Sequence, residues 1–107
     1  MSIKEELHQL VDLMNANPKA IESVHAVYRF NLGENGMYQV VFENGGATVS
    51  EEPADNADCT LTLSEKNFRK LLEDDLNTTM AFMTGSLKVD GKIGLALKLQ
   101  EILKQYR

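Results

Sequence analysis

A chain of 107 residues, 43% hydrophobic and 25% charged, fits a single domain over residues 1–107, because so short a chain cannot bury two cores. It holds no apolar run of about 18 residues and no basic segment leading into an apolar one at its start, which argues against a membrane-spanning helix and a secretory leader. The net charge of -5 argues against a nucleic-acid partner, since phosphate binding needs clustered lysines and arginines.

The first predicted element is a helix that begins after Ser2. Ser2 and Glu5 form a capping box, in which each side chain satisfies an amide of the first turn. Apolar residues then recur at steps of three and four and predict one buried stripe of Ile3, Leu7, Leu10, Val11 and Met14. Asn17 and Pro18 predict a short second helix that ends near Val24, because proline suits the first helical position.

From His25 onward the apolar period changes to two, which predicts strands of an antiparallel meander. The first hairpin has two inward-facing sets, Ala26, Tyr28, Phe30 and Leu32, then Tyr38, Val40 and Phe42. Residues 44–46 predict a second tight turn into a strand over 47–50, and a loop over 51–56 follows. A fourth strand over 58–63 turns one side inward, with Cys59, Leu61 and Leu63.

Two helices and a fifth strand are predicted next. Ser64 caps a helix whose inward residues are Phe68, Leu71 and Leu72. A short helix over 78–84, which ends at Gly85, carries the apolar residues Met80, Ala81, Phe82 and Met83. The fifth strand then points Leu87 and Val89 inward and Lys88 outward, and Gly91 lets the chain swing into the last helix.

The last predicted helix carries more apolar residues than one face can hold. At ~100° per residue, one broad stripe contains Leu95, Ala96, Leu99, Ile102, Leu103 and Tyr106. Ile93 and Leu97 lie outside that stripe. This second patch is covered by another helix, buried against a partner chain, or part of the wall of an apolar cavity, and spacing alone leaves the three open.

Residues that could carry chemistry are scattered along the chain. His8 and His25 are isolated, and Cys59 alternates with apolar residues as a small buried hydrophobe. The acidic runs 51–52 and 73–75 lack the alternating oxygen ligands of a calcium loop. We therefore expect no catalytic residue, no metal site and no cofactor. The lone cysteine excludes an internal disulfide and fits a reducing compartment, so we expect a cytoplasmic protein.

Charge is unevenly distributed along the sequence. Residues 1–84 hold 6 basic and 14 acidic residues, whereas residues 85–107 hold 5 basic and 2 acidic ones. The basic residues 85–107 either dock against the acidic residues 1–84 or face anionic lipid headgroups. The second alternative would allow a transient contact with a membrane surface.

The segment AFMTGSLKVDGKIGLALKLQEIL, residues 81–103, resembles the C-terminal signature of the sterol carrier protein type-2 domain. ADCTLTLSEKNFRKLL, residues 57–72, is similar to the fourth strand and following helix of that family, and the hairpin over 28–42 fits its opening strands. The resemblance covers about residues 20–105. It implies an α+β fold with a five-stranded, mostly antiparallel sheet covered by helices, and a hydrophobic tunnel between sheet and helices.

The same resemblance implies a non-enzymatic carrier of a small hydrophobic ligand, namely a fatty acid, fatty acyl-CoA, sterol or phospholipid. The chain ends in Gln105, Tyr106 and Arg107 rather than in a peroxisomal tripeptide, so we expect a standalone, bacterial-type member. Two other classes stay open. One is a homodimer or scaffold module that buries Ile93 and Leu97, and the other is an accessory module for an enzyme encoded elsewhere.

The candidate ligand-binding positions are inward apolar residues near the last helix: Leu72, Met80, Met83, Leu87, Leu95, Leu99, Ile102 and Leu103. Lys88, Lys92 and Lys98 are the candidates for contact with an anionic headgroup or a membrane surface. Because an empty cavity is unfavourable in so small a domain, we expect the site to be filled by a lipid or partly collapsed, with Met14, Met80 and Met83 as adaptable lining.

Overall fold

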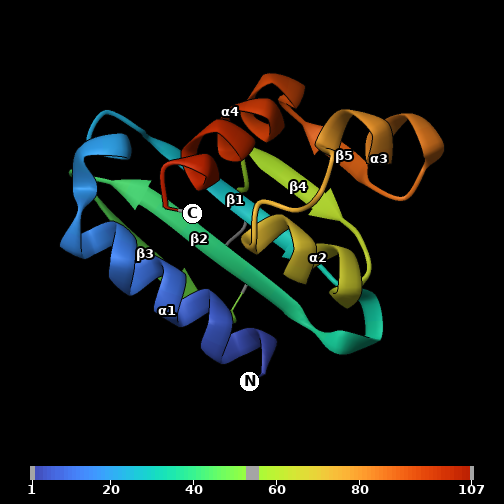
Figure 1. Cartoon of the computed structure of the whole chain (residues 1–107), viewed down its shortest axis with the longest axis horizontal. Coiled ribbons are helices and arrows are strands. Elements are labelled where there is room, and N and C mark those ends of the chain that lie inside the picture. The colour runs from blue at the N-terminus through green and yellow to red at the C-terminus, as the bar shows by residue number, and fades with distance from the viewer. Residues whose placement is uncertain (1, 53–55, 107) are drawn as a thin grey trace.

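A computed structural model describes residues 2–52 and 56–106, and Figure 1 shows its elements. The helices are α1 (Ile3–Ala16), α2 (Glu65–Leu72), α3 (Thr78–Thr84) and α4 (Ile93–Lys104), with short 3-10 turns η1 (Pro18–Ala20) and η2 (Gly33–Asn35). The strands are β1 (Ala26–Asn31), β2 (Met37–Glu43), β3 (Gly46–Ser50), β4 (Cys59–Thr62) and β5 (Lys88–Gly91). The predicted order of helices and strands is confirmed.

The strands form one five-stranded sheet in the order β3-β2-β1-β4-β5. The pairs β1/β2, β2/β3 and β4/β5 are antiparallel, whereas β1 and β4 are parallel. The sheet is therefore mixed and mostly antiparallel, as the resemblance implied. The parallel pair arises because the chain leaves β3 at one edge and returns beside β1, a long-range pairing that no local pattern in the sequence encodes.

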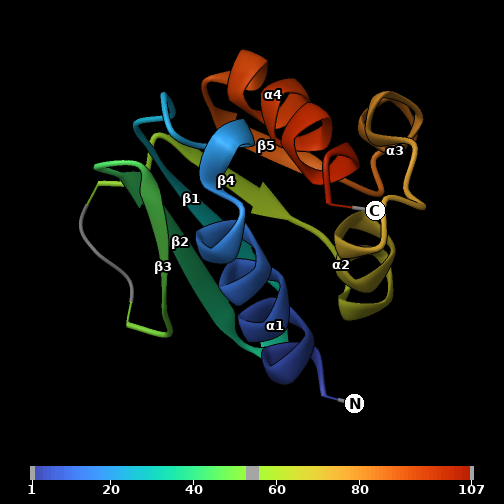
Figure 2. The same ribbon diagram turned by 60° about the vertical axis from the view of Figure 1, so that its left-hand side comes forward.

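Helices α1, α2 and α4 lie on one face of the sheet, and α3 lies beside α4 near β5 (Figures 1 and 2). The inward faces of the strands are buried as predicted, with Tyr28, Phe42 and Leu61 at most 1% exposed. Because side chains alternate along a strand, Thr60, Thr62 and Lys88 lie on the face that these helices leave uncovered.

Helix α1 follows its prediction closely. The Ser2 hydroxyl accepts a 3.1 Å hydrogen bond from the Glu5 amide, and all five residues of the predicted stripe are buried. A contact outside that stripe fixes the helix on the sheet. The Asn15 side chain accepts a hydrogen bond from the Ala47 amide at 2.8 Å and donates one to the Ala47 carbonyl at 2.9 Å. Asn15 thus completes the hydrogen bonding of strand β3 at this point.

The expectations in the first half of the chain have different outcomes. The predicted helix from Pro18 to about Val24 is wrong in extent, because a 3-10 turn ends at Ala20 and the Val24 amide closes a further turn on the Ile21 carbonyl. Residues 53–55 of the predicted loop lie outside the described part of the chain. The tight turn before β3 is confirmed by positive φ angles at Asn44 and Gly45.

Glycines form both turns around β5. Gly85 ends α3 with φ +84, in the left-handed conformation that a C-cap glycine adopts. Gly91 has φ +101, and a Cβ atom there would lie 2.5 Å from the Asp58 carbonyl oxygen. Only glycine allows this close approach of β5 to β4, after which the chain turns into α4.

Candidate functional site

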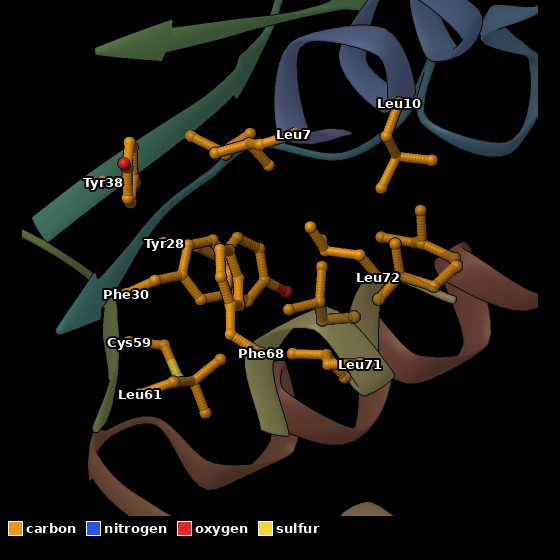
Figure 3. Packing of buried hydrophobic residues seen from close by; sticks show 14 of the residues in the cluster. Leu7, Leu10, Tyr28, Phe30, Tyr38, Cys59, Leu61, Phe68, Leu71 and Leu72 are labelled. Carbon is orange, nitrogen blue, oxygen red and sulfur yellow. The ribbon is translucent and has the colours of Figure 1, made fainter. Parts of the chain in front are cut away.

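Aromatic rings from the inward face of the sheet and from α2 pack against one another. The Phe30 and Phe68 rings lie 4.7 Å apart between centroids, and Tyr28 meets Phe42 edge-on at 5.7 Å. Figure 3 shows the rings of Tyr28, Phe30 and Phe68, with Leu7 and Leu10 of α1 on one side and Leu72 of α2 on another. The arrangement gives the middle of the molecule a rigid apolar floor.

An apolar space of about 10 Å³ lies between that floor and helices α1, α2 and α4. Every residue that lines it is apolar: Leu7, Leu10, Val11, Met14, Phe30, Val40, Phe42, Leu71, Leu72, Leu99 and Leu103. A ligand pocket for a small molecule usually holds about 300 Å³ or more. The side chains therefore fill this space almost completely in the described structure.

The Tyr28 hydroxyl connects the sheet to α4. It donates a 2.7 Å hydrogen bond to the Leu95 carbonyl in the first turn of the helix. Burial raises the pKa of the Tyr28 hydroxyl, and the Cys59 thiol and Asp58 carboxyl add to the rise. The tyrosine is therefore neutral at physiological pH and serves as a hydrogen-bond donor.

The structure brings together part of the predicted ligand-binding set. Leu72, Leu99 and Leu103 line the apolar space together with Met14. Leu87 and Ile102 are also buried, and Leu95 is half-buried against the core, but these three stand outside the lining of that space. The inward orientation predicted for these six residues is thus confirmed to different degrees, and their binding role stays a prediction.

Met80 and Met83 were expected to point inward, and this expectation is wrong. Their side chains are 56% and 75% exposed. Thr78 and Ala81 are the buried residues of α3, so these two side chains define the inward side of the helix. At ~100° per residue, Met80 and Met83 then lie on the opposite, outward side. The run of apolar residues over 80–83 occupies all sides of this seven-residue helix, so the sequence did not show which side faces the core.

An open groove of about 730 Å³ lies between the end of α1, η1 and the outer side of α4. Its lining mixes apolar and polar side chains, among them Leu13, Ile102, Lys19 and Lys98. At its end the Tyr106 hydroxyl donates a 2.7 Å hydrogen bond to the Asn17 carbonyl and so joins the end of α4 to the end of α1. This groove is adjacent to the apolar space, because Ile102 lies between Leu99 and Leu103 on the same two turns of α4.

The three candidate lysines are exposed but do not share one site. Lys98 lies in the groove with Lys19, a residue that the sequence interpretation did not single out. Lys92 is the N-cap residue of α4, and Lys88 lies on the uncovered face of the sheet. The geometry therefore favours Lys98, which shares a groove of mixed apolar and polar lining with Lys19 and with the carboxylate of Glu101.

A second pocket of about 150 Å³ lies between α3, β5 and the start of α4. Ile93 and Leu97, the two residues outside the main stripe of α4, line it together with Phe82. They are half exposed, at 50% and 49%. The second apolar patch of α4 is therefore only partly covered, by α3.

The described residues offer little for metal or thiol chemistry. Within residues 2–52 and 56–106, no group of three or more His, Cys, Asp and Glu side chains could hold a metal ion. Cys59 is fully buried, and burial raises the pKa of its thiol, with Asp58 and Asp90 adding to the rise. A buried thiol of raised pKa is a poor nucleophile. Over the same residues, no helix is both long and apolar enough to cross a membrane.

Sequence reasoning missed Lys19, Thr78 and Tyr106 as site residues. Lys19 and Tyr106 come from opposite ends of the chain and meet only because η1 folds back beside α4. For Thr78 no signal in the sequence marks its hydroxyl as buried. Tyr106 did belong to the predicted stripe of α4, so its apolar side could be predicted, whereas its hydrogen bond to Asn17 could not.

Comparison with known proteins matches residues 7–104 to the SCP-2 sterol transfer family. Hydroxysteroid dehydrogenase-like protein 2 of Xenopus tropicalis is 38% identical over 92 residues, which cover 83% of this chain and 22% of that protein. The chain thus spans about a fifth of the length of that relative.

Two solved structures share both fold and sequence features with the chain. Sterol carrier protein domain 2 of Helicoverpa armigera has a TM-score of 0.76 and 28% identity, covering 94% of this chain and 84% of that one. Sterol carrier protein 2 of Yarrowia lipolytica, in its apo form, has a TM-score of 0.74 and 28% identity, covering 95% and 87%. The family match over residues 7–104 and the shared fold agree, and the chain belongs to the SCP-2 sterol transfer family.

Proposed function

We propose that this chain binds and carries a lipid, without catalysing a reaction, by holding the hydrocarbon chain between the sheet and helices α1, α2 and α4. The observation that carries the proposal is the wholly apolar lining of the space between these elements. Membership of the SCP-2 sterol transfer family supports it. The ligand classes that we propose are fatty acid, fatty acyl-CoA, sterol and phospholipid.

The small volume of that space is consistent with a site that opens around its ligand. A cavity of ~300 Å³ left empty would cost about 7 kcal/mol, at ~24 cal/mol per Å³. That is comparable to the whole stability of a small domain, ~5 to 15 kcal/mol. An unliganded protein of this kind is therefore expected to close its site, and Met14 in the lining provides a side chain that can rearrange.

We further propose that the ligand enters through the groove between α1 and α4. The groove and the apolar space lie along the same pair of helices, so a small separation of α1 and α4 would connect them. Lys19 and Lys98 would then hold an anionic headgroup at the surface while the hydrocarbon chain passes inward. This assigns Lys98 of the three candidate lysines to the headgroup.

Thermal unfolding with and without palmitate tests the proposal, combined with mass spectrometry of lipid extracted from freshly purified, denatured protein. We expect a co-purified lipid or a rise in the melting temperature with added palmitate, because a ligand that binds only the native state stabilises it. No extracted lipid, together with no response to palmitate, sterol or phospholipid, would contradict the proposal.

Charge-removing variants test the headgroup assignment. Lys98→Gln and Lys19→Gln should each weaken palmitate binding by about twofold to fivefold at low salt, and less at high salt, as expected for a partly exposed ion pair. Lys88→Gln is the matched control, because Lys88 is an exposed lysine on the uncovered face of the sheet. Equal effects of all three changes would argue for net charge alone.

The homodimer or scaffold role remains a second candidate, and the half-exposed Ile93 and Leu97 favour it. In that case a dimer in solution should dissociate on Ile93→Lys, with palmitate binding unchanged.

An accessory role to an enzyme is a further alternative, because the chain matches only 22% of the length of the dehydrogenase-like relative. Co-purification of a partner enzyme in an undirected pull-down would support that role.

A further inference from the structure

The pocket between α3 and α4 contains a buried hydroxyl that has no hydrogen-bond partner. Thr78 lines this pocket of about 150 Å³ and is 4% exposed. Its Oγ1 atom has no partner among the described residues. A buried polar group without a partner is unfavourable, and native proteins retain few of them. A ligand atom that reached this hydroxyl would provide the hydrogen-bond partner that it lacks.

The remaining lining of the pocket is uncharged and mostly apolar: Thr79, Phe82, Val89, Ile93, Ala96 and Leu97. A hydrocarbon segment fits such a lining. An ionised carboxylate or phosphate does not, because no cationic side chain lines the pocket to compensate for its lost hydration. The ligand group beside Thr78 must accordingly be polar but neutral, such as a hydroxyl or a carbonyl oxygen.

The size of the pocket limits how much of a ligand it can take. At about 150 Å³ it is roughly half the volume of the smallest usual pocket for a whole small molecule. Ile93, Leu97 and Phe82 are partly exposed, so the rest of a longer molecule can leave the pocket across their surface. The pocket is therefore suited to one end of a chain or ring system.

We propose that this pocket binds the neutral, oxygen-bearing end of an amphiphile, with Thr78 Oγ1 hydrogen-bonded to its hydroxyl or carbonyl oxygen. The inference rests on the proposed function in that both take an amphiphilic lipid. It assigns a second, separate position, at which neutral amphiphiles are selected over anionic ones. It also gives the half-exposed Ile93 and Leu97 a role as the mouth of this pocket.

The test uses 1-octanol as the probe and octanoate at pH 8 as its charged counterpart, each titrated into ¹⁵N-labelled protein. Octanol should shift the amide signals of α3, which lines this pocket but not the carrier space, and octanoate should leave these α3 signals unchanged. Thr78→Val replaces the hydroxyl by a methyl group of similar size and should weaken octanol binding about threefold to tenfold, the equivalent of one hydrogen bond. Thr78→Ser, which keeps the hydroxyl, should retain most of the affinity.

Two further variants separate local from general effects. Thr84→Val removes a hydroxyl of the same helix that lies outside the pocket lining and should bind octanol as the wild type does. Leu97→Lys places a charge at the mouth on an exposed position and should abolish octanol binding even if Thr78→Val does not fold. Unchanged affinity of folded Thr78→Val, or binding that survives Leu97→Lys, would overturn the inference.

Palmitate stabilisation, measured on the wild type and on Thr78→Val, distinguishes this inference from the proposed function. If palmitate stabilises both proteins equally while octanol fails to shift the amide signals of α3, the second position is refuted and the lipid carrier stands. If octanol binds beside Thr78 but palmitate and the other lipids stabilise neither protein, the carrier proposal fails.

Discussion

The hydroxyl of Tyr28, on the central strand β1, donates a 2.7 Å hydrogen bond to the carbonyl oxygen of Leu95, in the first turn of α4. This bond connects the floor of the apolar space to the helix that closes it. Tyr28→Phe should lower the free energy of unfolding by about 1 kcal/mol, the usual net contribution of one such bond. Urea denaturation measures the difference.

Tyr38→Phe is the matched control for that change. Tyr38 is also buried on the inward face of the sheet, and its ring stacks near Phe68. No hydrogen bond of its hydroxyl is present among the described residues, so the change should stay within about 0.5 kcal/mol. Equal losses for the two variants would show that the bond to Leu95 contributes nothing specific.

Alkaline pH should destabilise the fold through the same tyrosine. Burial raises the pKa of Tyr28 in the folded state, whereas in the unfolded chain it titrates near its usual value of about 10. Between these two values the native state retains the proton that the unfolded state loses. The stabilisation is thus complete below about pH 10 and is lost as the pH rises beyond it, by up to ~1.4 kcal/mol per pH unit.

Denaturation curves at pH 8, 10 and 11 for the wild type and Tyr28→Phe measure this effect. The wild type should lose stability more steeply than the variant above pH 10, since the buried Cys59 thiol, whose pKa is also raised, contributes equally to both proteins. Parallel curves would refute the assignment to Tyr28.

Gly91 and Gly94 allow a paired test of the turn into α4. Gly91→Ala should destabilise the protein by more than about 2 kcal/mol, because φ is +101 and the new Cβ would meet the Asp58 carbonyl oxygen at 2.5 Å. Gly94→Ala should stabilise it by about 0.5 to 1 kcal/mol, because it lies in α4 with no atom within 4 Å of the new Cβ. Thermal unfolding of both variants checks the opposite signs.

Tyr106 and Asn17 join α4 to α1 at the end of the proposed entrance. Tyr106→Phe removes the 2.7 Å hydrogen bond but keeps the ring in place, so stability should fall by no more than about 1 kcal/mol. Ligand exchange should become faster, since separation of the helices no longer breaks that bond. Stopped-flow displacement of a fluorescent fatty acid measures the rate, and an unchanged rate would place the entrance elsewhere.

Local patterns in the sequence predicted the elements well. The apolar stripe of α1 and the inward-facing residues of β1 and β2 each follow from a pattern only a few positions long, and these residues are buried as expected. In β2 the alternation is incomplete, because Gln39 is buried as well. The parallel pairing of β1 with β4 and the Asn15 contacts with Ala47 join distant segments. Such pairings depend on tertiary packing, which no short-range period records.

The candidate site was predictable to the same degree. Periodicity in α2 and α4 identified Leu72, Leu99 and Leu103, and all three line the apolar space. It failed for Met80 and Met83, because α3 is too short for its apolar residues to define one face. Lys19 could not be found either, since only the folding of η1 beside α4 brings it near Lys98.

Contacts between bound palmitate and the protein test the central claim most directly. Isotope-filtered NOE spectra of ¹³C-methyl-labelled protein with unlabelled palmitate report which methyl groups lie near the acyl chain. We predict NOEs to the methyl groups of Met14, Leu99 and Leu103, which line the apolar space. NOEs confined to exposed residues such as Met80 and Met83, or none at saturating palmitate, would contradict the claim that the ligand lies beneath α4.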